Sequence, residues 1–184
     1  MKLRSFFPGL NKLNMSLTLE DITIRTELQP GDLGYIIHRH GKLYAKEYGY
    51  GIVFESYVAA GVHEFYQAYD PVKDCVWICE HHDHIVGFLL LMHRSESIAQ
   101  LRFFYIEPSY RSIGLGKKLM TLYMEFIKQR GYTSSYLWTT HEQTTAASLY
   151  QQYGFTLTEE KNSSAFGKPL REQRYELTVP FDDD

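Results

Sequence analysis

The chain has 184 residues, of which 44% are hydrophobic, and a formal net charge of −3 at pH 7. This length and composition are typical of one soluble globular domain with a buried core. No run of Lys or Arg is longer than the pair Lys117-Lys118, which argues against a nucleic acid or a membrane surface as partner. A small molecule or a peptide is the expected partner, and no membrane or nucleic acid is expected.

The two cysteines and the N-terminal segment indicate the cellular compartment of the protein. Residues 1–20 are predicted to be an N-terminal extension, and residues 21–184 to form one domain. Cys75 and Cys79 are four residues apart on a predicted strand, so their Cα atoms would lie about 13 Å apart, too far for a disulfide. Reduced thiols, with neither a signal peptide nor a long apolar run, lead us to expect a cytoplasmic protein.

The first third of the chain predicts one strand and two helices. Residues 22–28 alternate apolar and polar side chains, which favours a strand, and Pro30-Gly31 closes it. A helix follows, with Asp32 as its expected cap. A second helix is expected over residues 54–69, because Pro71 stops it.

The rest of the chain alternates predicted strands and helices. Three strands in succession indicate an antiparallel meander, with a hairpin at residues 81–83. A long helix follows a glycine-rich turn, since apolar residues recur every three or four positions up to residue 127. The predicted strands are residues 76–79, 85–92, 98–106, 136–139, 155–158 and 174–179, and a short helix covers 144–153. These elements predict a mixed α/β sheet.

The glycine-rich turn is the segment with the clearest functional signal. It reads Arg111-Ser112-Ile113-Gly114-Leu115-Gly116-Lys117 and lies between the strand ending at residue 106 and the long helix. The first N–H groups of a helix have no partner within it, and the positive end of the helix dipole lies behind them. An anion, such as a phosphate, is the expected ligand.

Two well-known phosphate motifs do not fit this turn. A nucleotide-binding P-loop needs Gly where Arg111 stands, and Ser or Thr, to hold magnesium, where Lys118 stands. The dinucleotide-binding motif begins correctly at Gly114 and Gly116, but Leu119 replaces its third glycine. Nucleoside triphosphates and dinucleotides are therefore not expected ligands.

The remaining pattern, Arg111-x-x-Gly114-x-Gly116, resembles the acetyl-CoA pyrophosphate loop of the GNAT superfamily of N-acetyltransferases. Upstream, residues 101–108 (LRFFYIEP) are similar to the fourth strand of that family. Downstream, residues 146–155 resemble its A-x-x-L-Y-x-x-x-G-F signature, with the tyrosine at Tyr150. The resemblance implies an α/β fold with a mixed, mostly antiparallel sheet of about six to seven strands and helices on both faces.

A closer resemblance covers most of the chain. The stretches at residues 31–34, 39–49 and 166–177 are similar to a bacterial subgroup in which this domain often follows a MarR-type winged helix. The first twenty or so residues are too few for such a helix domain. We therefore expect a bacterial GNAT domain alone, and no role in transcription is carried over from the fused relatives.

The resemblance also implies how acetyl-CoA would bind as cosubstrate. Its pyrophosphate would lie on the N–H groups of residues 112–117, with Arg111 adding positive charge. A Cβ at either glycine of the turn would obstruct the close approach of ligand to backbone. The pantetheine arm would lie beside Phe104, Tyr105 and Ile106, on a strand that separates from its neighbour. Gln143 stands where many relatives carry Asn, which keeps the amide on a longer side chain.

The resemblance implies direct attack of a primary amine on the thioester in a ternary complex, and the amine would belong to a small molecule, a peptide or a protein. Tyr150 matches the tyrosine that protonates the departing thiolate, and a phenol of pKa about 10 is protonated at pH 7. Three candidates for the general base that deprotonates the amine are left open, namely Glu107, Glu47 and a water held by Gln100 or Arg102. Strand alternation places Gln100 and Arg102 on one face and Glu107 on the other.

Contacts to the acceptor amine are expected from the first two helices, because these helices cover the acceptor site in this superfamily. Tyr44, Glu47 and Tyr48 are the candidate substrate contacts, together with Arg102. No metal is expected at His81-His82-Asp83-His84, because adjacent residues at a hairpin tip seldom close a coordination sphere. Homodimers are common among relatives, so the sequence leaves open whether this chain forms a homodimer. The alternative function is a non-catalytic acyl-CoA-binding sensor or regulatory module.

Overall fold

The computed structural model describes residues 17–179; most of the predicted N-terminal extension, residues 1–16, lies outside them. Within these described residues there are four α-helices, namely α1 (Asp32–Tyr48), α2 (Ile52–Gln67), α3 (Leu115–Gln129) and α4 (Thr144–Gln152). The strands are β1 (Thr23–Arg25), β2 (Cys75–His81), β3 (His84–His93), β4 (Ile98–Ile106), β5 (Ser134–Thr140), β6 (Thr156–Ser163) and β7 (Leu170–Thr178). Two short 3₁₀ helices, η1 (Leu19–Asp21) and η2 (Pro108–Tyr110), complete the elements.

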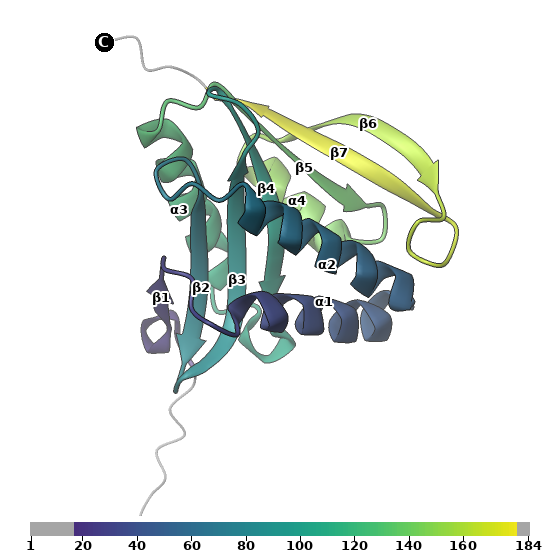
Figure 1. Ribbon diagram of the computed structural model, residues 1–184, viewed down its shortest axis with the longest axis horizontal. Coiled ribbons are helices and arrows are strands. Elements are labelled where there is room, and N and C mark those ends of the chain that lie inside the picture. The colour runs from purple at the N-terminus through teal and green to yellow at the C-terminus, as the bar shows by residue number, and fades with distance from the viewer. Residues whose placement is uncertain (1–16, 180–184) are drawn as a thin grey trace, which may run out of the picture.

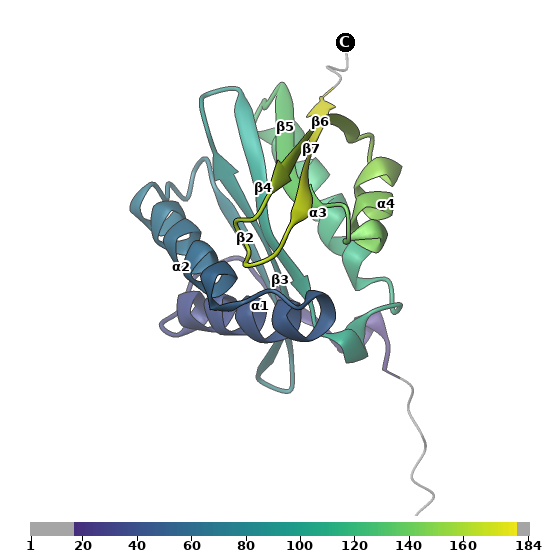
Figure 2. The ribbon, with the colours of Figure 1, turned by 90° about the vertical axis from the view of Figure 1, so that its right-hand side faces the viewer.

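The seven strands form one sheet in the order β1-β2-β3-β4-β5-β7-β6. All neighbours are antiparallel except β4 and β5. Helices α1 and α2 cover one face and α3 and α4 the other, as the two views in Figure 1 and Figure 2 show. The predicted fold, a mostly antiparallel sheet with helices on both faces, is confirmed.

Each face of the sheet has its own hydrophobic core. On β2 and β3 successive side chains alternate between the two, so that Trp77 and Leu89 pack with α3, while Val76 and Phe88 pack with α1 and α2. Because both faces are covered, these strands are almost continuously apolar, which is why the sequence shows short apolar runs here rather than strict alternation.

A β-bulge in β4 changes which residues share a face. Phe88 pairs with Tyr105 but Leu90 pairs with Arg102, so two residues of β4 lie opposite one of β3, and Phe103 adopts a φ of 53°. Because of the extra residue, side chains of β4 beyond the bulge point to the face opposite to the one that regular alternation predicts. Glu107, which follows β4, accordingly forms an ion pair with Arg39 of α1. Glu107 therefore lies on the same face as Arg102, and the prediction that the two face opposite sides is wrong.

The start of α1 also differs from the prediction. Gly31 occupies the N-cap position, and Asp32 is already helical. The Asp32 carboxylate accepts hydrogen bonds from Arg25 (2.7 and 2.8 Å) and from the backbone N–H of Gln29 (2.7 Å). Asp32 thus fastens the helix to β1 instead of capping it.

Both cysteines are free and buried, in agreement with the predicted absence of a disulfide between them. Within residues 17–179, no helix is both long enough and apolar enough to cross a membrane.

Candidate active site

The site forms where β4 and β5 separate. These strands pair only from Ile98 to Gln100 on β4 and from Ser134 to Tyr136 on β5. Beyond these pairs β5 continues to pair with β7, which leaves the β5-facing edge of β4 without a neighbouring strand. A cavity of about 110 Å³ lies beside this separation. Its lining comprises His40, Tyr44, Phe54, Tyr57, Val58, Gln100, Leu101, Arg102, Phe103, Phe104, Trp138, Thr139, Thr140, Gln143, Tyr150, Phe166 and Glu172.

The glycine turn opens α3 with a row of free backbone donors. Gly114 is the N-cap, in the left-handed region at φ 93°, and Ser112 also has a positive φ, of 68°. The first helical hydrogen bond is donated by Lys118 to the carbonyl of Gly114, at 3.0 Å. Among the described residues, no acceptor is bonded to the N–H groups of residues 112–117. This arrangement fits a phosphate.

Gly116 serves a different purpose from Gly114. A Cβ there would come within 3.3 Å of Leu149 of α4 and 3.5 Å of Ile106 of β4. No atom lies within 4 Å of the Cβ position at Gly114, so there the backbone conformation is the constraint. At Gly116 a packing requirement is thus added to the expectation that both glycines make room for the ligand.

Arg111 and Glu47, expected in separate roles, are paired with each other. Their side chains form two contacts, of 2.9 and 3.2 Å, and Arg111 Nε donates to the Ile106 carbonyl at 3.2 Å. This pair joins the last turn of α1 to the glycine turn. Neither residue is among those that line the cavity.

Tyr150 lies in α4 with its side chain almost fully buried and lines the cavity. Its ring is 6.2 Å from that of Phe104, centroid to centroid. Burial, and secondarily Tyr48, raise the pKa of Tyr150 above its usual value. At neutral pH the phenol therefore carries its proton, as a proton donor requires.

Gln143 stands at the start of α4, where it is the N-cap residue. Its side-chain oxygen accepts a hydrogen bond from the Thr139 hydroxyl at 2.8 Å, and both residues line the cavity. The amide nitrogen of Gln143 is therefore the group left to donate to a ligand.

Tyr44 is the only one of the three predicted α1 contacts that lines the cavity. It stacks on Phe54 at 4.9 Å between ring centroids, and burial raises its pKa well above the usual value. Tyr48 packs beside it, at 5.3 Å. His40, one turn earlier in α1, is buried and also lines the cavity, and burial lowers its pKa to about 4.

Glu107 and Tyr105 face α1 rather than the cavity. Arg39 forms an ion pair with Glu107 and donates to the Tyr105 hydroxyl at 3.1 Å. Tyr105 also stacks on Phe88 at 4.9 Å. The side chain of Tyr105 is therefore not available to the cavity. Arg102, in contrast, lines the cavity and pairs with Glu64 at 2.8 Å.

Several cavity residues were missed from the sequence. Trp138 and Glu172 line the cavity together because the register of β5 and β7 places both side chains on the same face of the sheet. Phe166 lines it from the loop between β6 and β7. Glu172 was identifiable only as one polar residue in an alternating strand. The Phe166 stretch carried a signal, since it belonged to the subgroup resemblance, but no role was assigned to it.

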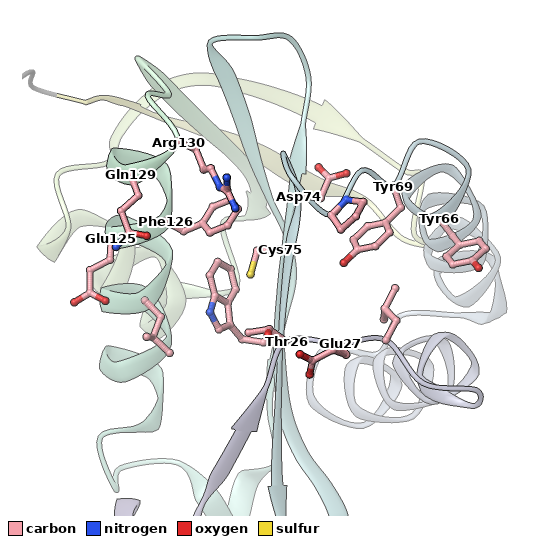
Figure 3. A pocket seen from close by; sticks show the side chains of 14 residues that line it. Thr26, Glu27, Tyr66, Tyr69, Asp74, Cys75, Glu125, Phe126, Gln129 and Arg130 are labelled. Carbon is pink, nitrogen blue, oxygen red and sulfur yellow. The ribbon is translucent and has the colours of Figure 1, made fainter.

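A larger cavity, of about 720 Å³, lies at the other edge of the sheet. Figure 3 shows Tyr66 and Tyr69 on one side of it and Phe126 and Arg130 on the other, with Cys75 between them. None of the predicted site residues lines it. Of residues 17–179, no three His, Cys, Asp or Glu side chains are grouped so that they could hold a metal ion.

Comparison with known proteins shows the family to which the chain belongs. The model of the acetyltransferase (GNAT) family matches residues 40–155, more than half of the chain. This chain therefore belongs to the GNAT acetyltransferase family, as its motifs predicted.

Two curated relatives are similar to part of the chain. The uncharacterized N-acetyltransferase YjgM of Escherichia coli is 33% identical over 95 residues, which cover 50% of this chain and 57% of the relative. N-acetyltransferase family 8 member 7 of Mus musculus is 27% identical over 121 residues, or 61% of this chain and 53% of the relative. The chain thus spans about half the length of the curated relatives it matches.

Solved structures share the fold. An acetyltransferase from Streptococcus agalactiae aligns with a TM-score of 0.67 at 17% identity, covering 87% of this chain and 99% of its own. The spermidine N-acetyltransferase of Vibrio cholerae, solved with CoA and spermine, aligns with a TM-score of 0.65 at 17% identity, covering 87% and 96%. At these identities the likeness extends to the fold alone.

Proposed function

We propose that the chain is an acetyl-CoA-dependent N-acetyltransferase that moves the acetyl group to a primary amine. The observation that carries this proposal is the meeting of three features at one place. The unpaired edge of β4, the buried phenol of Tyr150 and the amide of Gln143 border one cavity, and Phe104, which also lines it, lies 3.9 Å from the Cβ position at Gly116 of the glycine turn. Acetyl-CoA would supply the acetyl group as an activated thioester.

The proposed cosubstrate contacts follow the free backbone groups. The N–H groups of residues 112–117 would hold the pyrophosphate, and the backbone of Phe104, Tyr105 and Ile106 would hold the pantetheine arm. Arg111 would exchange its contact with Glu47 for a phosphate. A backbone N–H of β4 is also the group suited to stabilise negative charge on the thioester oxygen.

Direct attack by the amine is proposed because no Ser, Cys or Lys side chain is among the described residues that line the cavity. Burial raises the pKa of Cys75 and of Cys79 to about 12, so both thiols are protonated at neutral pH. Neither cysteine lines the cavity. Tyr150 would give its proton to the departing sulfur.

Removal of the proton from the attacking amine is proposed to run through water. Glu47 and Glu107 are each paired with an arginine and do not line the cavity, whereas Gln100 and Arg102 do line it. A water held by Gln100 or Arg102 would accept the proton and pass it to solvent.

The test is to measure CoA release by the intact chain with acetyl-CoA and a panel of primary amines. Release that depends on the amine supports the proposal. Thermal stabilisation by acetyl-CoA without acetylation of any amine, peptide or protein would instead favour a non-catalytic acyl-CoA sensor. Failure to bind CoA-agarose would exclude both functions.

A further inference from the structure

Aromatic rings from three elements wall the acceptor side of the cavity. Phe54 and Tyr57 come from α2, Trp138 from β5, and Phe166 from the loop between β6 and β7. The Phe166 ring lies 4.9 Å from that of Phe54 and 5.1 Å from that of Tyr57, centroid to centroid. Such a wall favours an apolar or aromatic ligand body over a strongly hydrated one.

The same apolar character continues onto the rim. At the start of α2, Ile52, Val53 and Tyr57 are 76, 54 and 47% exposed. The N–H of Gly51 donates to the Phe166 carbonyl at 3.2 Å, so this end of α2 abuts the loop that lines the cavity. An apolar molecule that entered here would cover side chains that are otherwise exposed to water.

The charges that line the cavity are few. Glu172 is its one carboxylate and Arg102 its one cation among the residues that the structure describes. Arg102 is paired with Glu64 at 2.8 Å, and its side chain is only 11% exposed. A molecule with several ammonium groups would need several carboxylates, and this lining offers one. The charges therefore favour a ligand with a single amine.

One ammonium group already contacts the pair Trp138 and Glu172. Lys161 of the edge strand β6 places Nζ 4.3 Å from the centroid of the Trp138 ring and 3.6 Å from a carboxylate oxygen of Glu172. An aromatic face beside a carboxylate stabilises an ammonium through both interactions. Trp138 and Glu172 line the cavity, whereas Lys161 does not and is half exposed. Lys161 thus shows that this pair can hold a primary ammonium.

We propose that the acceptor is a primary monoamine on an apolar or aromatic body, and that Trp138 and Glu172 bind its ammonium group. The inference rests on the proposed acetyl transfer and adds the class of acceptor. A free amino acid fits less well. Arg102, the one cation among the described residues that line the cavity, is already paired with Glu64 and would have to give up that contact to bind the carboxylate of the amino acid.

The test compares three amines at saturating acetyl-CoA, with CoA release as the readout. 2-Phenylethylamine has one amine and an aromatic body, L-phenylalanine adds a carboxylate, and spermidine has several amines and no ring. We expect kcat/KM for 2-phenylethylamine to exceed both others at least about tenfold. Equal or higher values for L-phenylalanine or spermidine would overturn the inference.

Variants test the two binding residues. Glu172→Gln is expected to raise KM for 2-phenylethylamine at least about tenfold and to change KM for acetyl-CoA less than about twofold. Glu176→Gln is the matched control, since Glu176 lies on the same strand, pairs with Arg174 and does not line the cavity. Lys161→Met removes the internal ammonium and is expected to lower KM for the amine. Wild-type KM for 2-phenylethylamine in a folded Glu172→Gln variant would refute the role of Glu172.

The outcome for the acceptor class is separable from that for the proposed function. Calorimetric titration of acetyl-CoA reports binding regardless of the acceptor. Turnover with spermidine or L-phenylalanine alone would overturn the acceptor class and leave the acetyltransferase intact. Binding without turnover of any amine would overturn both. If Glu172→Gln does not fold, the Lys161→Met variant decides, because an unchanged or raised KM for the amine there contradicts the inference.

Discussion

Lowering the pH from 7.5 to 5.0 is expected to destabilise the chain through His40. This side chain is 4% exposed and lies among aromatic rings, 5.4 Å from those of Tyr44 and Phe88 and 5.7 Å from that of Phe103. Its Nδ1 donates to the Ile36 carbonyl at 2.9 Å, which fixes the tautomer. The rings offer no partner for a second proton, so the imidazole remains neutral in the folded chain.

The size of this loss of stability follows from the difference between the pKa of His40 in the folded chain and its pKa in the unfolded chain. Burial lowers the pKa of His40 from 6.5 to about 4. Because the folded pKa is depressed, the unfolded chain binds more protons between pH 6.5 and pH 4, and stability is lost as the pH falls through this window. The loss is about 2 kcal/mol at pH 5 and reaches about 3 kcal/mol below pH 4. Typical domains have about 5 to 15 kcal/mol in total, so the effect is measurable.

Urea denaturation at pH 7.5 and 5.0 provides the assay, with His40→Leu as the test variant. The free energy of unfolding of the wild type should fall by about 2 kcal/mol more than that of His40→Leu between these pH values. His38→Gln is the control on the same helix, since His38 is exposed, and it should keep the wild-type pH dependence. Equal losses in the wild type and His40→Leu would refute the reasoning.

Three other substitutions test separate parts of the site. Tyr150→Phe keeps the ring but removes the phenol proton, so kcat should fall about 100-fold with little change in acetyl-CoA affinity; a kcat within threefold of wild type would exclude Tyr150 as the proton donor. Gly114→Ala forces a side chain into the left-handed region at φ 93° and should cost about 1 to 2 kcal/mol in urea denaturation, whereas an unchanged midpoint would contradict the strain. Glu47→Gln removes the carboxylate that competes with a phosphate for Arg111, and calorimetry should show acetyl-CoA binding about two- to fivefold tighter; weaker binding, or loss of one limb of the pH–rate profile, would contradict this reading.

The elements and the glycine turn were predictable because their signals are local. The stripe of apolar residues in α3, the glycine turn before it and the run from Ile98 to Ile106 each occupy consecutive positions, so periodicity and spacing identify them. Tyr150 was found in the same way, from a motif of ten residues. The fold followed from the order of these elements and from the family resemblance.

The cavity wall that includes Trp138 and Glu172 was not predictable, because strand pairing brings its residues together. Trp138 and Glu172 are neighbours only through the register of β5 and β7. The Arg111–Glu47 pair joins residues 64 positions apart. The bulge at Phe103 has no sequence signal such as a glycine, and it reverses the face of every residue that follows in β4. Strand alternation alone therefore misplaced Glu107.

The central claim is that the glycine turn and the unpaired edge of β4 hold acetyl-CoA. Amide hydrogen exchange, measured by mass spectrometry with and without acetyl-CoA, tests it most directly. Bound acetyl-CoA is predicted to protect the N–H groups of residues 112–117 and those N–H groups of residues 101–106 that point away from β3, because these are the donors left free in the structure. Unchanged exchange at residues 112–117, with protection confined to the larger cavity beside Cys75 and Arg130, would contradict it.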